Sequence, residues 1–204
     1  MTASPTAAHD GDARDATRWT VLAITLPAGP SRHRLAVWRE LRRMGALSLG
    51  QGVWAVPDVP VFADGIVRTL ELTERAGGEA VSLAAAGRGA QDAARLRALF
   101  TAARSADWAV FLADCGKFEE ELAKGIRVAG FTLAELEEDE QSLERLRRWH
   151  RDLTARDVFR APEAAEAGER LRGCTAACED YAERVFAHLH QVPAARASEE
   201  DAAG

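Results

Sequence analysis

The chain has 204 residues, of which 47% are hydrophobic, so it can hold one domain with an extension or two small domains. Its formal net charge of −6 excludes an unaided, whole-surface affinity for nucleic acid. No apolar run approaches the roughly 20 residues that a membrane-spanning helix needs, and the polar residues 1–18 predict a disordered tail rather than a secretory signal.

The start of the folded part predicts a strand followed by a helix. Residues 19–27 form a short apolar run that is rich in β-forming side chains and ends at Pro27. A helix follows, with Ser31 as a candidate N-cap and Gly45 as its end. Its apolar residues are expected on one broad face: Leu35, Val37, Trp38, Leu41 and Met44. Its arginines fall mostly on the other side.

Gly50-Gln51-Gly52 separates two strand-like runs, residues 46–49 and 53–57. A phosphate-binding glycine loop leads from a strand into a helix. This one leads into a second strand, so it predicts a tight hairpin that needs positive φ angles.

A second helix and a fourth strand complete this part of the chain. The segment 59–78 predicts a helix that ends at Gly77-Gly78, with Val61, Ile66, Leu70 and Leu72 in helical register, and 79–86 predicts a strand. The order strand, helix, strand, strand, helix, strand is the split βαβ pattern. We therefore expect an α+β protein whose residues 19–88 form a ferredoxin-like domain.

The rest of the chain predicts helices. Residues 89–192 are expected to form a helical extension and 193–204 a second disordered tail. Three amphipathic helices are indicated, the last introduced by Pro162. Their apolar stripes hold Leu96, Leu99, Phe100, Ala103, Trp108, Phe111 and Leu112; then Leu136, Leu143, Leu146, Trp149 and Leu153; then Leu171, Cys174, Cys178, Tyr181, Val185 and Leu189.

Several of these pieces resemble the N-terminal domain of ChrB, the chromate-resistance regulator family. The matching pieces are Leu26-Pro27, Val37-Trp38-Arg39, Gly45-Ala46 and Gly52-Val53-Trp54 with its stop at Pro57, and the segments 77–80, 96–112 and 156–171 fit that family's helical extension. The resemblance covers most of 19–190. It implies a cytoplasmic regulatory protein that senses chromate, a related oxyanion or oxidative stress and controls a resistance operon.

The first part also resembles the middle domain of PaaX-type repressors and the ferredoxin-like CRISPR adaptation nucleases. Those nucleases carry a metal-binding Asp late in the first strand, where this chain has Thr25. A hydroxyl cannot replace a carboxylate as a ligand for a hard cation. We therefore expect no metal site. PaaX proteins carry a winged helix ahead of this domain, and the residues before Trp19 are too few and too polar for one.

Arginines are the candidate site residues because their fixed fork of donors suits oxyanions and phosphates. The candidates for an anion- or DNA-binding site are Arg32, Arg39, Arg42, Arg43, Arg148 and Arg151, with Arg34 in the same first-helix cluster. Two or three converging arginines would hold chromate. The alternative is a solvated helix face in a protein where all basic residues but Lys117 and Lys124 are arginines.

The other chemistry-bearing residues are three cysteines and two histidines. Cys174 and Cys178 fall on an apolar stripe, so we predict buried thiols rather than metal ligands or redox groups, and Cys115 stands apart. The odd number of cysteines, with no disulfide framework, predicts a cytoplasmic protein. His33 and His150 are the candidate catalytic residues of an alternative function, an enzyme with a pocket between the sheet and the helical extension.

Nothing in the sequence completes that enzyme. Neither histidine stands in an acid–histidine–nucleophile arrangement, so we favour a regulator and expect no cofactor, with haem as the alternative. A non-catalytic partner-binding module is the third possibility. The five tryptophans are predicted to be core or dimer-interface anchors rather than base-stacking platforms. The expected partners are chromate, operator DNA and, because sheet edges need protection, a second copy in a homodimer.

Overall fold

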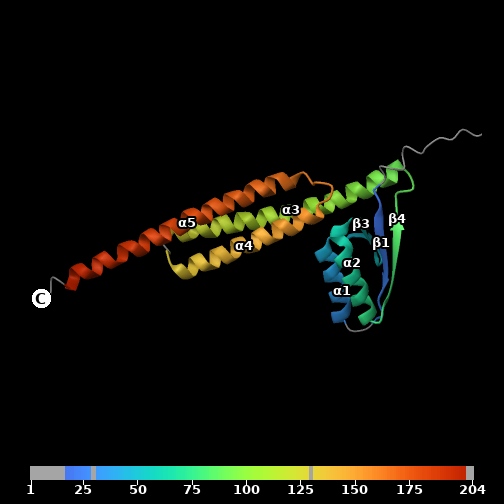
Figure 1. Ribbon diagram of the computed structural model, residues 1–204, viewed down its shortest axis with the longest axis horizontal. Helices are drawn as coiled ribbons and strands as arrows, with labels where there is room; N and C mark the ends of the chain where they lie inside the picture. Colours follow the sequence, from blue (N-terminus) through green and yellow to red (C-terminus); the bar gives the residue numbers. More distant parts are fainter. Residues whose placement is uncertain (1–16, 29–30, 129–130, 201–204) are drawn as a thin grey trace, which may run out of the picture. The chain divides into compact units, whose positions relative to one another are not determined.

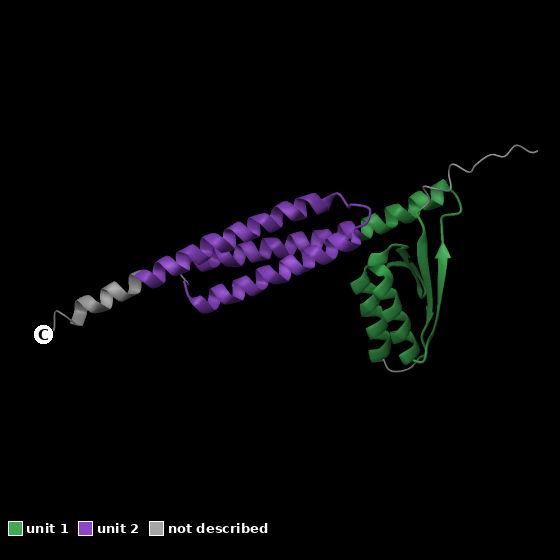
Figure 2. Cartoon of the chain, viewed as in Figure 1, with its two compact units in different colours: residues 1–103 green, residues 104–204 purple. Residues whose placement is uncertain are grey.

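The structure, a computed structural model, describes residues 17–28, 31–128 and 131–200. Side chains are described for residues 17–28, 32–128 and 131–190. Of the predicted tails, residues 1–16 and 201–204 lie outside the described residues. The chain divides into two compact units, residues 1–103 and 104–204 (Figure 2).

The first unit is a four-stranded antiparallel sheet with two helices on one of its faces (Figure 1). The strand order is β2-β3-β1-β4, so the first strand is central. The elements are β1 (Trp19–Thr25), α1 (Ser31–Met44), β2 (Leu47–Gly50), β3 (Val53–Pro57), the 3-10 turn η2 (Pro60–Phe62), α2 (Ala63–Arg75) and β4 (Glu79–Ala85). The predicted α+β class is confirmed, and the strands and helices follow one another in the predicted order.

Small side chains bring α1 and α2 close together. A Cβ on Gly65 of α2 would lie only 2.8 Å from the Sδ of Met44 in α1. Thr69 and Thr73, which continue this stripe, are buried, and their hydroxyls donate to the carbonyl oxygens of Gly65 and Thr69 at 2.8 and 2.9 Å. The predicted stripe on α2 was wrong at Val61, which is exposed in the preceding turn.

The predicted apolar face of α1 was too broad. Val37, Leu41 and Met44 are buried as expected, but Leu35 and Trp38 are 42% and 50% exposed. The buried face of the helix includes Glu40 next to Val37 and Leu41, and it does not include Trp38. Trp38 therefore lies on the solvent side of α1, although it stands at helical spacing from the buried Leu41.

The predicted hairpin is confirmed between β2 and β3. Gln51 and Gly52 form its two-residue turn with φ angles of 41° and 82°, and Gly50 before them has φ of 105°. The turn is tied to the central strand, because the Ile24 N–H donates to the Gly52 carbonyl at 2.8 Å. A Cβ on Gly52 would lie 2.4 Å from the Ile24 carbonyl oxygen. Only glycine fits there.

We predict that Gly52→Ala lowers the free energy of unfolding by about 1–3 kcal/mol, because it combines a positive φ with a backbone clash. Gly50→Ala is the matched control, since its φ is also positive but its Cβ would meet open space. Urea denaturation followed by circular dichroism gives both values. Equal losses for the two variants would show that the contact with β1 is unimportant.

An aromatic cluster closes one end of the first unit. The ring of Trp19 lies edge-on to Phe100 at 5.7 Å between centroids, and Phe62 lies edge-on to Phe100 at 6.1 Å. All three side chains are buried. Phe100 belongs to the long helix α3 (Ala90–Arg127), so the first turns of α3 are part of the first unit.

The second unit packs the rest of α3 with α4 (Leu133–Arg156) and α5 (Glu163–Glu200), which run alongside one another (Figure 1). The predicted stripes account for most of its core, which includes Trp108, Phe111, Leu136, Leu143, Leu146, Leu153, Cys174, Cys178, Tyr181 and Val185. The prediction was wrong at Leu189, which is exposed near the end of the described side chains, and at Leu99 in the first unit.

Asp157 ties the turn between α4 and α5 to α3. Its buried carboxylate accepts hydrogen bonds from the indole N–H of Trp108 at 2.9 Å and from the backbone N–H of Ala161. When the acceptor of a buried hydrogen bond is removed, the donor stays buried without a partner, and the folded state is destabilised by the cost of desolvating that donor.

We therefore expect Asp157→Ala to destabilise the protein by about 2–3 kcal/mol, because it leaves two buried donors unpaired. Asp152→Ala, which removes an exposed carboxylate from α4, is the control and should change stability by less than about 0.5 kcal/mol. Thermal unfolding of both variants checks this. A neutral result for Asp157→Ala would contradict the role given to that carboxylate.

Candidate anion-binding surface

Helix α1 is unusually basic for its length. It carries five arginines and one glutamate, and its first turn has no acidic residue. The helix ends as predicted at Gly45, which has φ of 82°. The Ala46 N–H then donates back to the Leu41 carbonyl at 2.9 Å, which completes a glycine C-cap.

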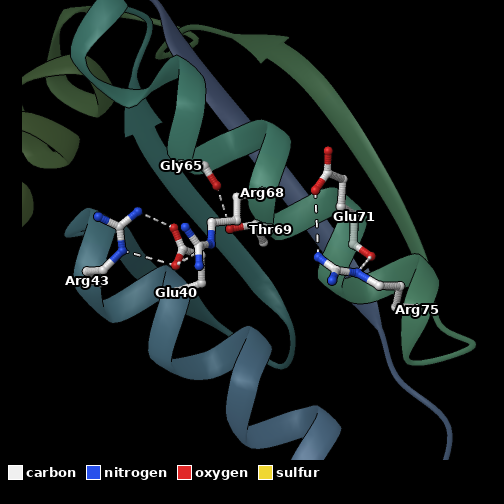
Figure 3. A network of polar contacts seen from close by, with 7 residues as sticks. All are labelled: Glu40, Arg43, Gly65, Arg68, Thr69, Glu71 and Arg75. Atoms are coloured by element: carbon white, nitrogen blue, oxygen red, sulfur yellow. Dashed lines mark hydrogen bonds and ion pairs between the residues drawn. The ribbon is translucent and has the colours of Figure 1, made fainter.

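The single acid of α1, Glu40, is buried against α2 (Figure 3). Its carboxylate pairs with Arg43, one turn on, whose Nε lies 3.0 Å from Oε2. It also faces Arg68 of α2, whose Nε lies 3.5 Å from the same oxygen. A buried carboxylate needs such partners to offset its desolvation. Glu40 and Arg43 therefore neutralise each other at the α1–α2 contact.

The remaining arginines of α1 are exposed and are not paired with acids in the described part of the chain. They are Arg32, Arg34, Arg39 and Arg42. The Arg42 guanidinium lies 5.5 Å from the centre of the exposed Trp38 ring, within the range of a cation–π contact. The Arg32 Nε donates to His33 at 3.3 Å.

The six predicted arginines are therefore divided. Arg32, Arg39 and Arg42 lie on the solvent side of α1 without an acidic partner in the described chain, whereas Arg43 is committed to Glu40. Arg148 and Arg151 belong to α4 in the second unit. Arg151 is paired with Glu144 at 3.3 Å, and Arg148 is exposed.

The sequence reasoning missed the place of Trp38. Arg34, Trp38 and Arg42 follow one another at intervals of four residues, which puts them on one strip of the helix surface. That spacing is visible in the sequence, and it indicates a tryptophan set among arginines rather than in the core.

The two candidate catalytic histidines have different surroundings. His33 is half-buried beside Arg32. His150 packs against the rings of Trp108 and Phe111, with centroids 5.3 and 5.6 Å away, and this burial lowers its pKa. Its Nε2 is buried and finds no hydrogen-bond partner among the described residues. Across the described part of the chain, no three His, Cys, Asp or Glu side chains gather as metal ligands.

The prediction of buried thiols is confirmed for Cys174 and Cys178, and Cys115 is buried with them. The Cys174 thiol lies 3.7 Å from the Cys115 carbonyl oxygen and 3.7 Å from a carboxylate oxygen of Glu119. Glu119 in turn pairs with Arg170 at 2.7 Å. The hydrogen bond between the Cys115 and Cys174 side chains lowers the pKa of the Cys115 thiol and raises the pKa of the Cys174 thiol. Burial raises the pKa of Cys178.

We predict that none of the three thiols reacts readily with Ellman's reagent in the folded protein, because a buried thiol must wait for the bundle to open. All three should react at once in concentrated urea. Ala109→Cys, which places a thiol on the exposed side of α3, is the positive control. Rapid labelling of the unchanged native protein would show that the thiols are accessible.

Comparison with known families gives one decisive match. A family model described as "Protein ChrB, N-terminal" matches residues 34–192. The chain belongs to the ChrB N-terminal family. The matched range takes in most of both units and begins within α1, at Arg34. The resemblance to ChrB is thus confirmed, while the likeness to PaaX stays a prediction.

One further comparison and one property of the helices concern this ChrB-family chain. A search of curated proteins found no match. Among the helices that the structure describes, none combines the length and the apolar character needed to cross a bilayer.

Proposed function

We propose that this protein is a ChrB-type regulator that binds operator DNA through α1 and responds to chromate or a related oxyanion. The observation that carries the proposal is the set of three exposed arginines, Arg32, Arg39 and Arg42, which have no acidic partner in the described chain. The family match supports a regulator of the chromate-resistance type.

The charge distribution favours one binding surface over a general affinity. The whole chain has a formal charge of −6, so most of its surface repels a polyanion. Helix α1 is a strongly basic part of that surface, since its only acid is buried and already paired. Guanidinium groups spaced along an exposed helix suit the phosphates of a nucleic acid backbone. Trp38, half exposed among them, adds a flat apolar contact.

Chromate could bind to the same guanidinium groups as the DNA phosphates. It is a tetrahedral dianion, and guanidinium groups bind such anions through paired N–H donors. An oxyanion held by Arg39 and its neighbours would compete with DNA phosphates for the same donors. In a homodimer two α1 surfaces would be presented to one DNA site, and release of both would free the operon.

The first test is the salt dependence of binding to the DNA upstream of the protein's own gene, followed by fluorescence anisotropy. Replacing Arg32, Arg39 and Arg42 by Gln should lower the slope of log K against log salt by about 2–3, because each phosphate contact contributes about 0.9. The matched control removes the same charge from ion-paired arginines: Arg75, Arg172 and Arg184 to Gln. An equal loss in the control, or no binding at low salt, would contradict the proposal.

The second test asks whether the response is specific to chromate. Chromate should release the DNA at concentrations where sulfate, a dianion of similar shape, has no effect at the same ionic strength. Anisotropy of the same labelled DNA measures both titrations. Equal release by the two anions would mean simple screening and would remove the sensing part of the proposal.

A further inference from the structure

The first unit contains an open cavity of about 540 Å³ beside the basic face of α1. Ile24 and Leu26 line it from the end of β1, Trp54 from β3, and Leu35 and Trp38 from α1. Its volume falls within the range of about 300–1,000 Å³ that is usual for small-molecule sites. Its wall is almost wholly apolar.

Backbone geometry keeps the cavity open. Gly52 lines it at the β2–β3 turn, where its carbonyl accepts a hydrogen bond from the Ile24 N–H and its positive φ disfavours other residues. A side chain that filled this corner would meet the backbone of β1. The opposite wall, Leu35 and Trp38, is held on the rigid helix α1 and stays 42% and 50% exposed. Most of the described lining residues thus lie on β1, β3 and α1.

Among the lining residues that the structure describes, Arg34 alone is charged. It is exposed and makes no ion pair with an acid among the described residues. It lies in the first turn of α1, where the unpaired backbone N–H groups add a partial positive charge and no acidic side chain offsets it. The cavity therefore offers a positive charge next to apolar walls.

We propose that this cavity binds a small amphipathic carboxylate, with its charged group at Arg34 and its hydrocarbon part against Trp38 and Trp54. A fully apolar ligand would leave Arg34 without an anion. A small inorganic oxyanion would leave the tryptophans and leucines exposed. An amphipathic carboxylate satisfies both parts of the wall.

The site goes beyond the DNA-binding proposal and does not depend on it. Arg32, Arg39 and Arg42, which carry that proposal, do not line the cavity. Arg34 does, and Trp38 is the residue that the two surfaces share. A ligand in the cavity would contact Trp38 and so lie next to Arg42.

The experiment uses octanoate and its uncharged counterpart 1-octanol as probes of the full chain without DNA. Binding is followed by tryptophan fluorescence and isothermal titration calorimetry. We expect one octanoate per chain, bound at least tenfold more tightly than 1-octanol. Arg34→Gln should reduce octanoate binding to the level of 1-octanol and leave 1-octanol unchanged. Arg75→Gln, which removes an exposed arginine of α2 outside the cavity, should change neither.

A second variant tests the apolar wall. Leu35→Glu places a carboxylate at the exposed mouth of the cavity and should weaken octanoate at least tenfold, with circular dichroism confirming the fold. The proposal is overturned if octanoate does not saturate, if 1-octanol binds equally well, or if Arg75→Gln acts like Arg34→Gln. It is also overturned if one octanoate binds per two chains, because a second copy would then occupy the cavity.

Discussion

The buried carboxylate of Glu40 determines what α1 presents to solvent. A charge placed between two helices is costly unless it is paired, and Glu40 is paired with Arg43 on its own helix and Arg68 on α2 (Figure 3). These contacts fix the rotation of α1 about its axis. With Glu40 turned inward, the helix has no acid left on its outer side.

The exposed residues of α1 consequently contribute to two surfaces, a basic strip and the lining of the cavity. Arg32, Arg39 and Arg42 form an unneutralised basic strip, which suits a polyanion. Arg34 and Leu35, both exposed, line the cavity together with Gly52 of the β2–β3 turn. Helix α2 packs closely against α1 because small residues such as Gly65 lie at the contact. This close packing fixes the position of α1 and of the arginines that it carries.

Most of the fold was predictable because each element carries its own local signal. Gly50-Gln51-Gly52 indicated a hairpin because two glycines separate two strand-like runs, and its φ angles bear this out. The α2 packing stripe was not predictable from hydrophobicity. Its buried members are Gly65, Thr69 and Thr73, whose hydroxyls bond to their own helix and need no partner elsewhere.

The candidate site was predictable only as a set of arginines. Arg39 and Arg43 look alike in the sequence, and what separates them is that Arg43 reaches Glu40. That distinction depends on the rotation of α1 against α2, which is tertiary information. The misplacement of Trp38 has the same origin, because its helical spacing from Leu35 and Leu41 suits either side of the helix.

In the proposed function, α1 presents its unpaired arginines to an anionic partner, while Arg43 and Arg68 stay paired with Glu40. Arginine Nε–H resonances, recorded by NMR during titration with a short DNA duplex, test it most directly. We expect shifts for Arg32, Arg39 and Arg42 and unchanged signals for Arg43 and Arg68. Shifts confined to arginines of the second unit, or equal shifts for all arginines of α1, would contradict it.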